Sequence, residues 1–204
     1  MLFDDTYRTI KEKSTGLYKE KGSKFIALAM PFESEAAIKA ELESIRKEYY
    51  DARHHCYAYV LGPDKSAWRV NDDGEPSGTA GRPIHGQIQS FDLTNILVVV
   101  IRYFGGTKLG VSGLINAYKS ATQDALQQAE IIEKTVNEIY ELKFTYANMN
   151  DVMRVVKDEN VDIIDSQFGI ECIITYRIRK SMADIVNSKF RKSYDNIIIY
   201  KGNE

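Results

Sequence analysis

Three short stretches of the chain contain side chains that could do chemistry. They are Arg53-His54-His55-Cys56, the acidic loop Asp72-Asp73-Gly74-Glu75, and a glycine-rich segment at residues 105–113. Carboxylates beside histidines are the groups that general acid–base catalysis uses, whereas glycine-rich backbone ahead of a helix suits a bound phosphate. The three stretches therefore leave two kinds of function open: an anion-binding protein, and an enzyme acting on a small phosphorylated substrate.

The glycine-rich segment follows an apolar run at residues 96–101, which predicts a strand buried on both faces. Its four glycines allow positive φ angles and close approach of another group. Ser112 is predicted to cap the helix that follows. Gly105 and Gly110 have the spacing of a P-loop, but Val111-Ser112 occupies the places of its Lys and Ser/Thr, so no nucleotide-binding motif is matched. A tight turn that binds no ligand is the alternative.

Cations and hydroxyl groups complete the predicted anion site. Arg102 and Lys108 lie next to the glycines, and the loop after Glu75 supplies hydroxyls and a guanidinium group. The predicted phosphate- or nucleic-acid-binding residues are Arg53, Ser77, Thr79, Arg82, Arg102, Gly105, Gly106, Lys108, Gly110 and Ser112.

The candidate catalytic residues are His54, His55, Asp73 and Glu75. One of the two carboxylates would be the general base or a metal ligand, and one histidine would carry a proton. Neighbouring residues of a strand face opposite sides, so the two histidines are not expected to share a metal ion. No metal or cofactor is predicted. Cys56 is interpreted as a buried, inert thiol, and a solvated turn is the alternative for the acidic loop.

Composition is that of an ordinary globular protein rather than a basic nucleic-acid binder. The formal net charge is -2 and the pI is near 6.0. Residues 1–137 hold 17 Lys or Arg against 18 Asp or Glu, and the remainder holds 10 against 11. Any nucleic-acid site is therefore a local patch. The two cysteines are far apart in the sequence, which does not suggest a disulfide framework. The N-terminus does not resemble a signal peptide, and no apolar run has the length of a membrane-spanning helix. The sequence therefore predicts a cytoplasmic protein with no membrane partner.

The pattern of elements predicts two α+β domains, at residues 1–134 and 138–204. In the first we expect strands at 16–20, 24–32, 54–61, 67–71 and 96–101, a helix capped by Ser34, a short helix at 83–90, and the helix after Ser112. In the second we expect strands at 139–146, 161–168, 170–178 and 196–201, with helices capped by Asn148 and Ser181. This order, β-α-β-β-α-β, is the ferredoxin-like signature.

Four blocks of this sequence resemble the Impact/YigZ family. They are Lys21-Gly22-Ser23-Lys24-Phe25, residues 52–59, residues 72–81, and residues 98–118 with Arg102-Tyr103-Phe104-Gly105-Gly106 at their centre. The resemblance implies an N-terminal domain with the α+β fold of the second domain of a small-subunit ribosomal protein and of the GHMP kinases. It implies a ferredoxin-like C-terminal domain similar to that of elongation factor G.

Both implied folds have relatives in translation. Eukaryotic Impact proteins are translation regulators that act through protein partners, and they carry an additional domain that this chain lacks. The resemblance therefore implies a nucleic-acid or ribosome-associated binding protein linked to the regulation of translation. RNA or the ribosome is the expected partner, and a protein partner is the alternative.

Overall fold

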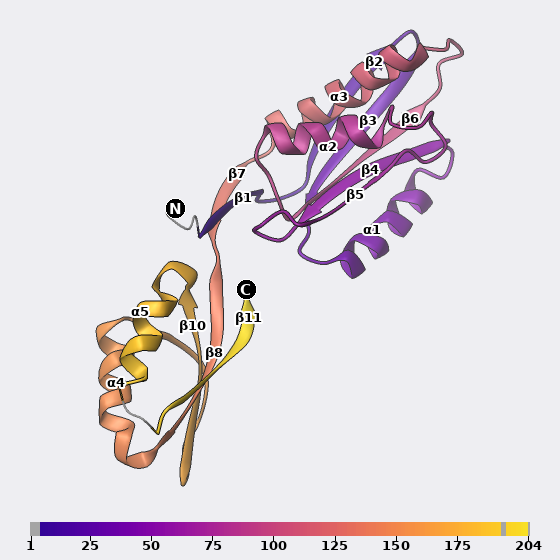
Figure 1. Cartoon of the computed structure of the whole chain (residues 1–204). Coiled ribbons are helices and arrows are strands. Elements are labelled where there is room, and N and C mark those ends of the chain that lie inside the picture. Colours follow the sequence, from indigo (N-terminus) through magenta and orange to yellow (C-terminus); the bar gives the residue numbers. More distant parts are fainter. Residues whose placement is uncertain (1–4, 193–194, 204) are drawn as a thin grey trace. The chain divides into compact units, whose positions relative to one another are not determined.

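A computed structural model describes residues 5–192 and 195–203, and it is an α+β structure of helices and antiparallel sheets. The chain divides into two compact units (Figure 1). The N-terminal unit is Tyr7–Lys134, and the C-terminal unit comprises the described residues from Thr135 onward. Asp5 and Thr6, which the sequence placed in the first domain, group with the C-terminal unit.

The N-terminal unit is built on a five-stranded sheet in which every pairing is antiparallel. Its strands, in spatial order, are β2 (Ser14–Glu20), β3 (Ser23–Pro31), β6 (Ile96–Tyr103), β4 (His54–Leu61) and β5 (Ala67–Asn71). Helices α2 (Gly81–Ser90) and α3 (Gly110–Gln128) cover one face, and α1 (Glu35–Glu48) covers the other (Figure 1).

The central strand β6 explains the continuous apolar run. Ile96, Val98 and Val100 pack in the core shared with α2 and α3. Leu97 and Val99 alternate with them and pack in the core shared with α1. Because both faces of β6 are covered, no position of the run is left for a polar residue. The predicted strand buried on both faces is confirmed.

The serines predicted to cap helices do so at one helix and not at two others. Ser34 caps α1, since its hydroxyl accepts a hydrogen bond from Ala37 N over 3.3 Å. Ser112 does not cap α3: the helix begins at Gly110, so Ser112 lies in its first turn. Ser181 likewise lies inside α5 (Lys180–Phe190). Ser112 lies two residues after the first residue of α3, and Ser181 lies one residue after the first residue of α5. A preference for serine at helix starts does not locate the first residue of a helix to within one or two positions.

Two strands were not predicted from sequence. They are β1 (Thr6–Ile10) and β7 (Ile131–Thr135), which pair with each other in a two-stranded sheet. Each is five residues long, and the two strands are more than a hundred residues apart in the chain. A short, largely polar strand of this kind is defined by its partner rather than by its own periodicity.

The C-terminal unit has the predicted element order β-α-β-β-α-β. Its elements are β8 (Asn137–Thr145), a 3-10 turn η1 (Tyr146–Asn148), α4 (Met149–Asp158), β9 (Asp162–Gln167), β10 (Glu171–Arg179), α5 and β11 (Ile197–Asn203). The strands form an antiparallel sheet in the order β11-β8-β10-β9. Helices α4 and α5 pack on one face around Leu142, Phe144 and Tyr176.

The side chain of Asp5 forms hydrogen bonds with residues of the C-terminal unit. Its carboxylate accepts hydrogen bonds from Arg179 Nε at 2.6 Å and Arg179 Nη2 at 2.7 Å, and from Ser181 N at 3.1 Å. The Asp5 side chain is 6% exposed. The bonds from Arg179 hold the pKa of the Asp5 carboxyl well below its usual range, against the opposing effect of burial.

We expect Asp5→Asn to lower the free energy of unfolding by about 2 kcal/mol at pH 7, as for loss of a charged hydrogen-bonding group. Because the folded pKa is depressed, this contribution is present above the unfolded Asp pKa of about 3.9 and falls as the pH drops below it. The difference between wild type and variant is therefore about 1 kcal/mol smaller at pH 3. Urea unfolding followed by circular dichroism at both pH values measures it, and an equal difference at both would contradict the assignment.

Candidate functional site

The three chemically interesting stretches meet at one end of the N-terminal sheet. His54, the first residue of β4, pairs with Arg102 near the end of β6, and Arg102 pairs with Phe25 near the start of β3. The acidic loop returns to the same place, because Asp73 O lies 2.8 Å from His54 Nδ1. We call this region the loop end; it comprises the β2–β3 turn, residue 53, residues 72–80 and residues 104–109.

Asp72 organises the loop that precedes α2. One oxygen of its carboxylate accepts hydrogen bonds from Ala80 N at 3.0 Å and Gly81 N at 2.8 Å, and the other accepts one from Gly78 N at 2.8 Å. Backbone N–H groups at a helix start would otherwise lack partners. Asp72 therefore holds the loop and the first turn of α2 in place.

Asp73 is held among cationic and backbone groups. Its carboxylate accepts from Arg46 Nη2 at 3.0 Å and from His55 N at 2.7 Å. The His55 ring is buried, and its Nε2 lies 3.0 Å from Tyr49 O. Both histidines thus contact backbone carbonyl groups, and the partner of His55 is Tyr49, the C-cap residue of α1.

Glu75 and Arg102 form a buried ion pair. Arg102 Nη1 donates to Glu75 Oε1 over 2.5 Å, and their side chains are 7% and 4% exposed. The Tyr118 hydroxyl, from α3, donates to the same oxygen over 2.8 Å. The guanidinium lies 5.4 Å from the ring centre of Phe25 and 5.6 Å from that of Phe104. Arg102 is therefore committed to Glu75, and binding a phosphate would compete with a buried pair.

Cys56 is a buried thiol next to this pair. Its Sγ lies 3.0 Å from Asp72 O and 3.3 Å from the Tyr118 hydroxyl. Burial raises the pKa of the Cys56 thiol far above its ordinary value. A thiol nucleophile needs a lowered pKa, so this environment favours the inert role. Cys172 is also a buried free thiol.

The hydroxyls and the guanidinium predicted beside the acidic loop have different surroundings. Thr79 is buried, and its hydroxyl donates to Pro76 O over 2.7 Å. Ser77 and Arg82 are exposed, and a Cβ added to Gly78 would lie 3.7 Å from Arg82 Cδ. Of these three, Ser77 and Arg82 are accessible to a ligand.

The glycine-rich segment is exposed and packs against the β2–β3 turn at one point. Gly105 N donates to Ser23 Oγ over 3.1 Å. A Cβ on Gly105 would lie 1.9 Å from the carbonyl carbon of Gly22, so only glycine permits this approach. Gly106 and Gly110 have φ values of +88° and +73°, and a Cβ there meets nothing within 4 Å. Lys108 and Ser112 are exposed.

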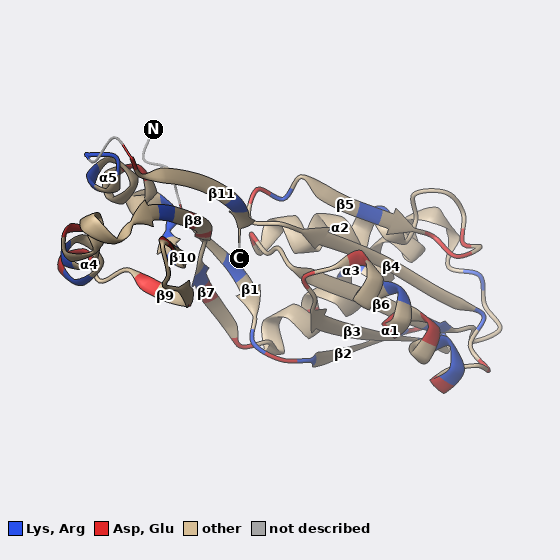
Figure 2. Cartoon of the chain, turned by 90° about the horizontal axis from the view of Figure 1, so that it is seen from below, with Lys and Arg blue, Asp and Glu red and all other residues tan. Residues whose placement is uncertain are grey.

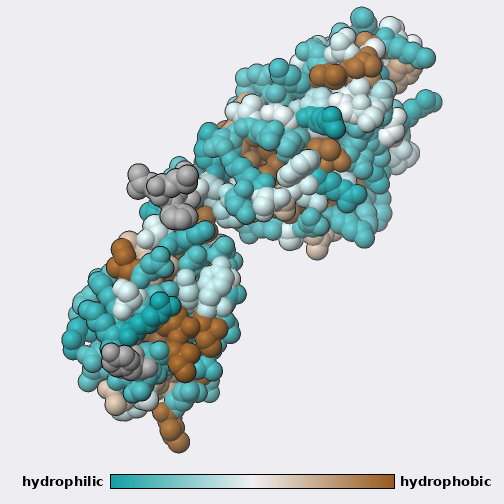
Figure 3. All heavy atoms as spheres, viewed as in Figure 1, coloured by the Kyte–Doolittle hydropathy of each residue, from teal (hydrophilic) through white to brown (hydrophobic). Residues whose placement is uncertain are grey.

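The contact between Gly22 and Gly105 adds lysines of the β2–β3 hairpin to the candidate site, and these lysines are not among the residues predicted from the sequence. Lys19, Lys21 and Lys24 belong to the β2–β3 hairpin and are exposed, and the turn of this hairpin contacts Gly105, three residues before Lys108. The block Lys21–Phe25 carries part of the family resemblance, but no local sequence pattern indicates that this turn reaches a loop eighty residues later. Figure 2 shows Lys and Arg together with Asp and Glu on both units, and Figure 3 shows hydrophilic residues over most of the visible face of each.

In residues 5–192 and 195–203, no group of three or more His, Cys, Asp or Glu side chains is placed to hold a metal ion. No helix in that part of the chain is long and apolar enough to cross a membrane.

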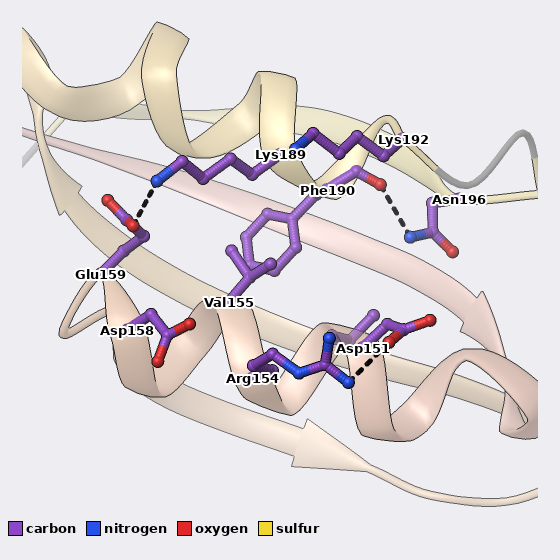
Figure 4. Close-up of a pocket in the computed structure, with 10 residues that line it drawn as sticks. Asp151, Arg154, Val155, Asp158, Glu159, Lys189, Phe190, Lys192 and Asn196 are labelled. Atoms are coloured by element: carbon purple, nitrogen blue, oxygen red, sulfur yellow. Dashed lines mark hydrogen bonds and ion pairs between the residues drawn. The ribbon is translucent and has the colours of Figure 1, made fainter.

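The C-terminal unit has a cleft of about 510 Å³ between α4 and α5 (Figure 4). Val155 and Phe190 lie within it, and Glu159 pairs with Lys189 across it. Its walls carry charges of both signs, so it shows no preference for an anionic ligand.

Comparison with known proteins gives consistent matches. Residues 21–126 match the family model described as the Impact N-terminal domain. The chain is 39% identical over 150 residues to the IMPACT family member YigZ of Escherichia coli (strain K12), which covers 72% of this chain and 74% of that protein. It is 31% identical over 192 residues to an IMPACT family member of Haemophilus influenzae, covering 92% and 93%. A solved structure titled as a hypothetical protein is 30% identical, with a TM-score of 0.72 and 98% of both chains covered.

Proposed function

Because the chain belongs to the IMPACT family, we propose that it is a cytoplasmic RNA-binding protein that acts in the regulation of translation. RNA phosphates bind at the loop end of the N-terminal unit, and the RNA surface of a ribosomal subunit is the proposed partner. The link to translation rests on the family resemblance. The RNA-binding site rests on the geometry of the loop end.

The observation that carries the proposal is the contact between Gly22 and Gly105. It places the exposed Lys21 and Lys24 of the β2–β3 hairpin beside the loop that contains Lys108. Lys–phosphate contacts are the main sequence-independent source of affinity for nucleic acids. Arg53 and Arg82, both exposed at the same end of the sheet, extend this set.

Most acidic side chains at the loop end already have ion-pair or hydrogen-bond partners within the protein. Glu75 pairs with Arg102, Asp73 pairs with Arg46, and Asp72 accepts backbone N–H groups. Glu20 and Asp51 remain, and each accepts a hydrogen bond from a tyrosine hydroxyl. The exposed lysines and arginines therefore outnumber the acids that would repel a phosphate.

The backbone of the glycine-rich segment adds to this set of cations. Gly106 and Gly110 leave open space beside the chain just before α3. N–H groups at the start of a 19-residue helix carry a partial positive charge that favours an anion. This feature supplements the lysines in the proposed site.

The geometry favours binding over catalysis. Asp73 and Glu75, the two candidate general bases, both accept hydrogen bonds from arginines. Each carboxylate would have to give up this bond before it could take a proton from a substrate. In the C-terminal unit, Arg177, Arg179 and Lys189 are paired with Asp162, Asp5 and Glu159, so the N-terminal loop end is the better phosphate site.

We expect the double variant Lys24→Gln and Lys108→Gln to bind RNA more weakly and with a smaller dependence on salt. The slope of log affinity against log salt should fall by about 1.4, the value for two lost phosphate contacts on a single strand. Anisotropy of a fluorescein-labelled single-stranded oligoribonucleotide measures both quantities across a salt titration. Purified ribosomal subunits are the second probe.

A charge-matched control is Lys13→Gln with Lys39→Gln. Both lysines are exposed; Lys13 precedes β2 at the opposite end of the sheet, and Lys39 lies on α1. This control should keep the wild-type slope. If the two double variants behaved alike, or if wild type bound neither probe, the RNA assignment would be wrong. Inorganic phosphate that blocked binding at low millimolar concentration would instead favour a small phosphorylated ligand.

A further inference from the structure

The chain's single tryptophan is exposed on an edge strand and stacked on a histidine. Trp68 lies on β5, the outermost strand of the N-terminal sheet, and is 56% exposed. Its ring stacks on that of His85 from α2, with centres 4.8 Å apart and planes 28° from parallel. Figure 1 shows α2 over the part of the sheet that ends in β5. A large apolar ring is thus held at the surface in a defined orientation.

The two elements that carry Trp68 and His85 contain arginines and no carboxylates. Arg82 precedes His85 by three positions, so the two share one face of α2. Gly86 follows His85, and a Cβ there would meet nothing within 4 Å, which leaves the space beside the histidine open.

This aromatic pair lies within reach of the loop end. Helix α2 begins against the end of β5, since a Cβ on Gly81 would be 2.8 Å from Asn71 N. Trp68 stands three residues back along the strand, about 10 Å from Asn71. Arg82 lies two residues after the loop end, near the start of α2, on the helix face that carries His85. The β2–β3 hairpin and β5 lie at opposite edges of the sheet, so an RNA strand that contacts both the loop-end lysines and Trp68 crosses the ends of β6 and β4 and passes Arg82.

We propose that Trp68 is a stacking platform for a base of single-stranded RNA, held in orientation by His85 and flanked by Arg82. The proposal rests on the RNA-binding function above and adds a contact that reads the base rather than the phosphate. An exposed aromatic ring beside cations is the arrangement that sequence-tolerant single-strand binding uses. Burial lowers the pKa of His85, which keeps the supporting ring neutral at neutral pH.

One titration with two readouts tests the platform. A labelled single-stranded oligoribonucleotide of mixed sequence is added to wild type while anisotropy of the label and intrinsic fluorescence of Trp68 are both followed. Because Trp68 is the only tryptophan, its fluorescence reports this site alone. We expect RNA to quench it in step with binding. Inorganic polyphosphate, which has phosphates and no bases, should compete for the lysines and leave the fluorescence unchanged.

Three single variants distinguish a base-stacking contact from a phosphate contact. Trp68→Ala should weaken RNA binding by about tenfold without changing the salt slope, because a base contact is lost and no phosphate contact is. Trp68→Phe keeps a ring and should stay within about threefold of wild type. Tyr200→Ala removes an aromatic side chain of similar exposure, 52%, from the C-terminal unit and should have no effect.

The outcomes distinguish the platform from the RNA site itself. Binding seen by anisotropy without quenching, or an unchanged affinity in Trp68→Ala, would overturn the platform and leave the lysine site standing. Equal quenching by RNA and polyphosphate would also overturn it. Quenching by RNA that persisted unchanged in Lys24→Gln with Lys108→Gln would support the platform and remove the loop-end site. Absence of any RNA binding would refute both proposals.

Discussion

Replacing Arg102 with methionine is expected to lower the free energy of unfolding by about 3–5 kcal/mol, the range for breaking a buried ion pair by removing one partner. The cost arises because Glu75 stays behind, 4% exposed, with the Tyr118 hydroxyl as its remaining side-chain donor at Oε1. Loss of the guanidinium also removes contacts with the rings of Phe25 and Phe104. Urea unfolding followed by Trp68 fluorescence measures the effect, since Trp68 belongs to the same unit.

The matched control is Arg46→Met, which breaks the ion pair with Asp73. There the arginine side chain is 51% exposed, so we expect a loss below about 1 kcal/mol. The double variant Glu75→Gln with Arg102→Met removes both buried charges and should recover part of the loss. Equal effects of Arg102→Met and Arg46→Met would contradict the buried pair. An Arg102 variant is consequently unsuitable for testing phosphate binding, because its folding changes first.

The second large effect is expected for Gly105→Ala. The new methyl group would stand 1.9 Å from the carbonyl carbon of Gly22 and 2.2 Å from Ser23 N, and both of those atoms are backbone. The β2–β3 turn and the glycine-rich segment must then separate, at a cost of about 3 kcal/mol, the upper end of the usual range for overpacking. RNA affinity should fall as well, because the hairpin lysines move away from Lys108.

Gly106→Ala is the control in the same segment. A Cβ at Gly106 meets nothing, and only its φ of +88° is unfavourable, so we expect a loss of about 1–2 kcal/mol and little change in RNA affinity. Unfolding monitored by Trp68 fluorescence and binding monitored by anisotropy compare the two variants. The contact would lose its assigned role if Gly105→Ala bound RNA as tightly as Gly106→Ala does.

Some features of the fold could be predicted because they depend on residues close together in the chain. Strand β6 was recognised from six consecutive apolar residues, which both cores then bury. The β-α-β-β-α-β order of the C-terminal unit followed from alternating strand and helix periods. The family resemblance, which rested on local blocks of sequence, was confirmed by the match over residues 21–126.

Other features depend on which distant residues meet, and local patterns do not contain that information. Strands β1 and β7 exist because they pair with each other, and the exact start of α3 depends on the turn at Gly110.

The candidate site shows the same division. Residue types alone indicate which segments could do chemistry, and they predict Glu75 as a base and Arg102 as a phosphate ligand. The folded chain instead places these two side chains against each other and packs the β2–β3 turn on Gly105. Local sequence does not contain this information, because a charged group acts through its partners and its burial, and both are set by the packing of strands and helices that lie far apart in the chain.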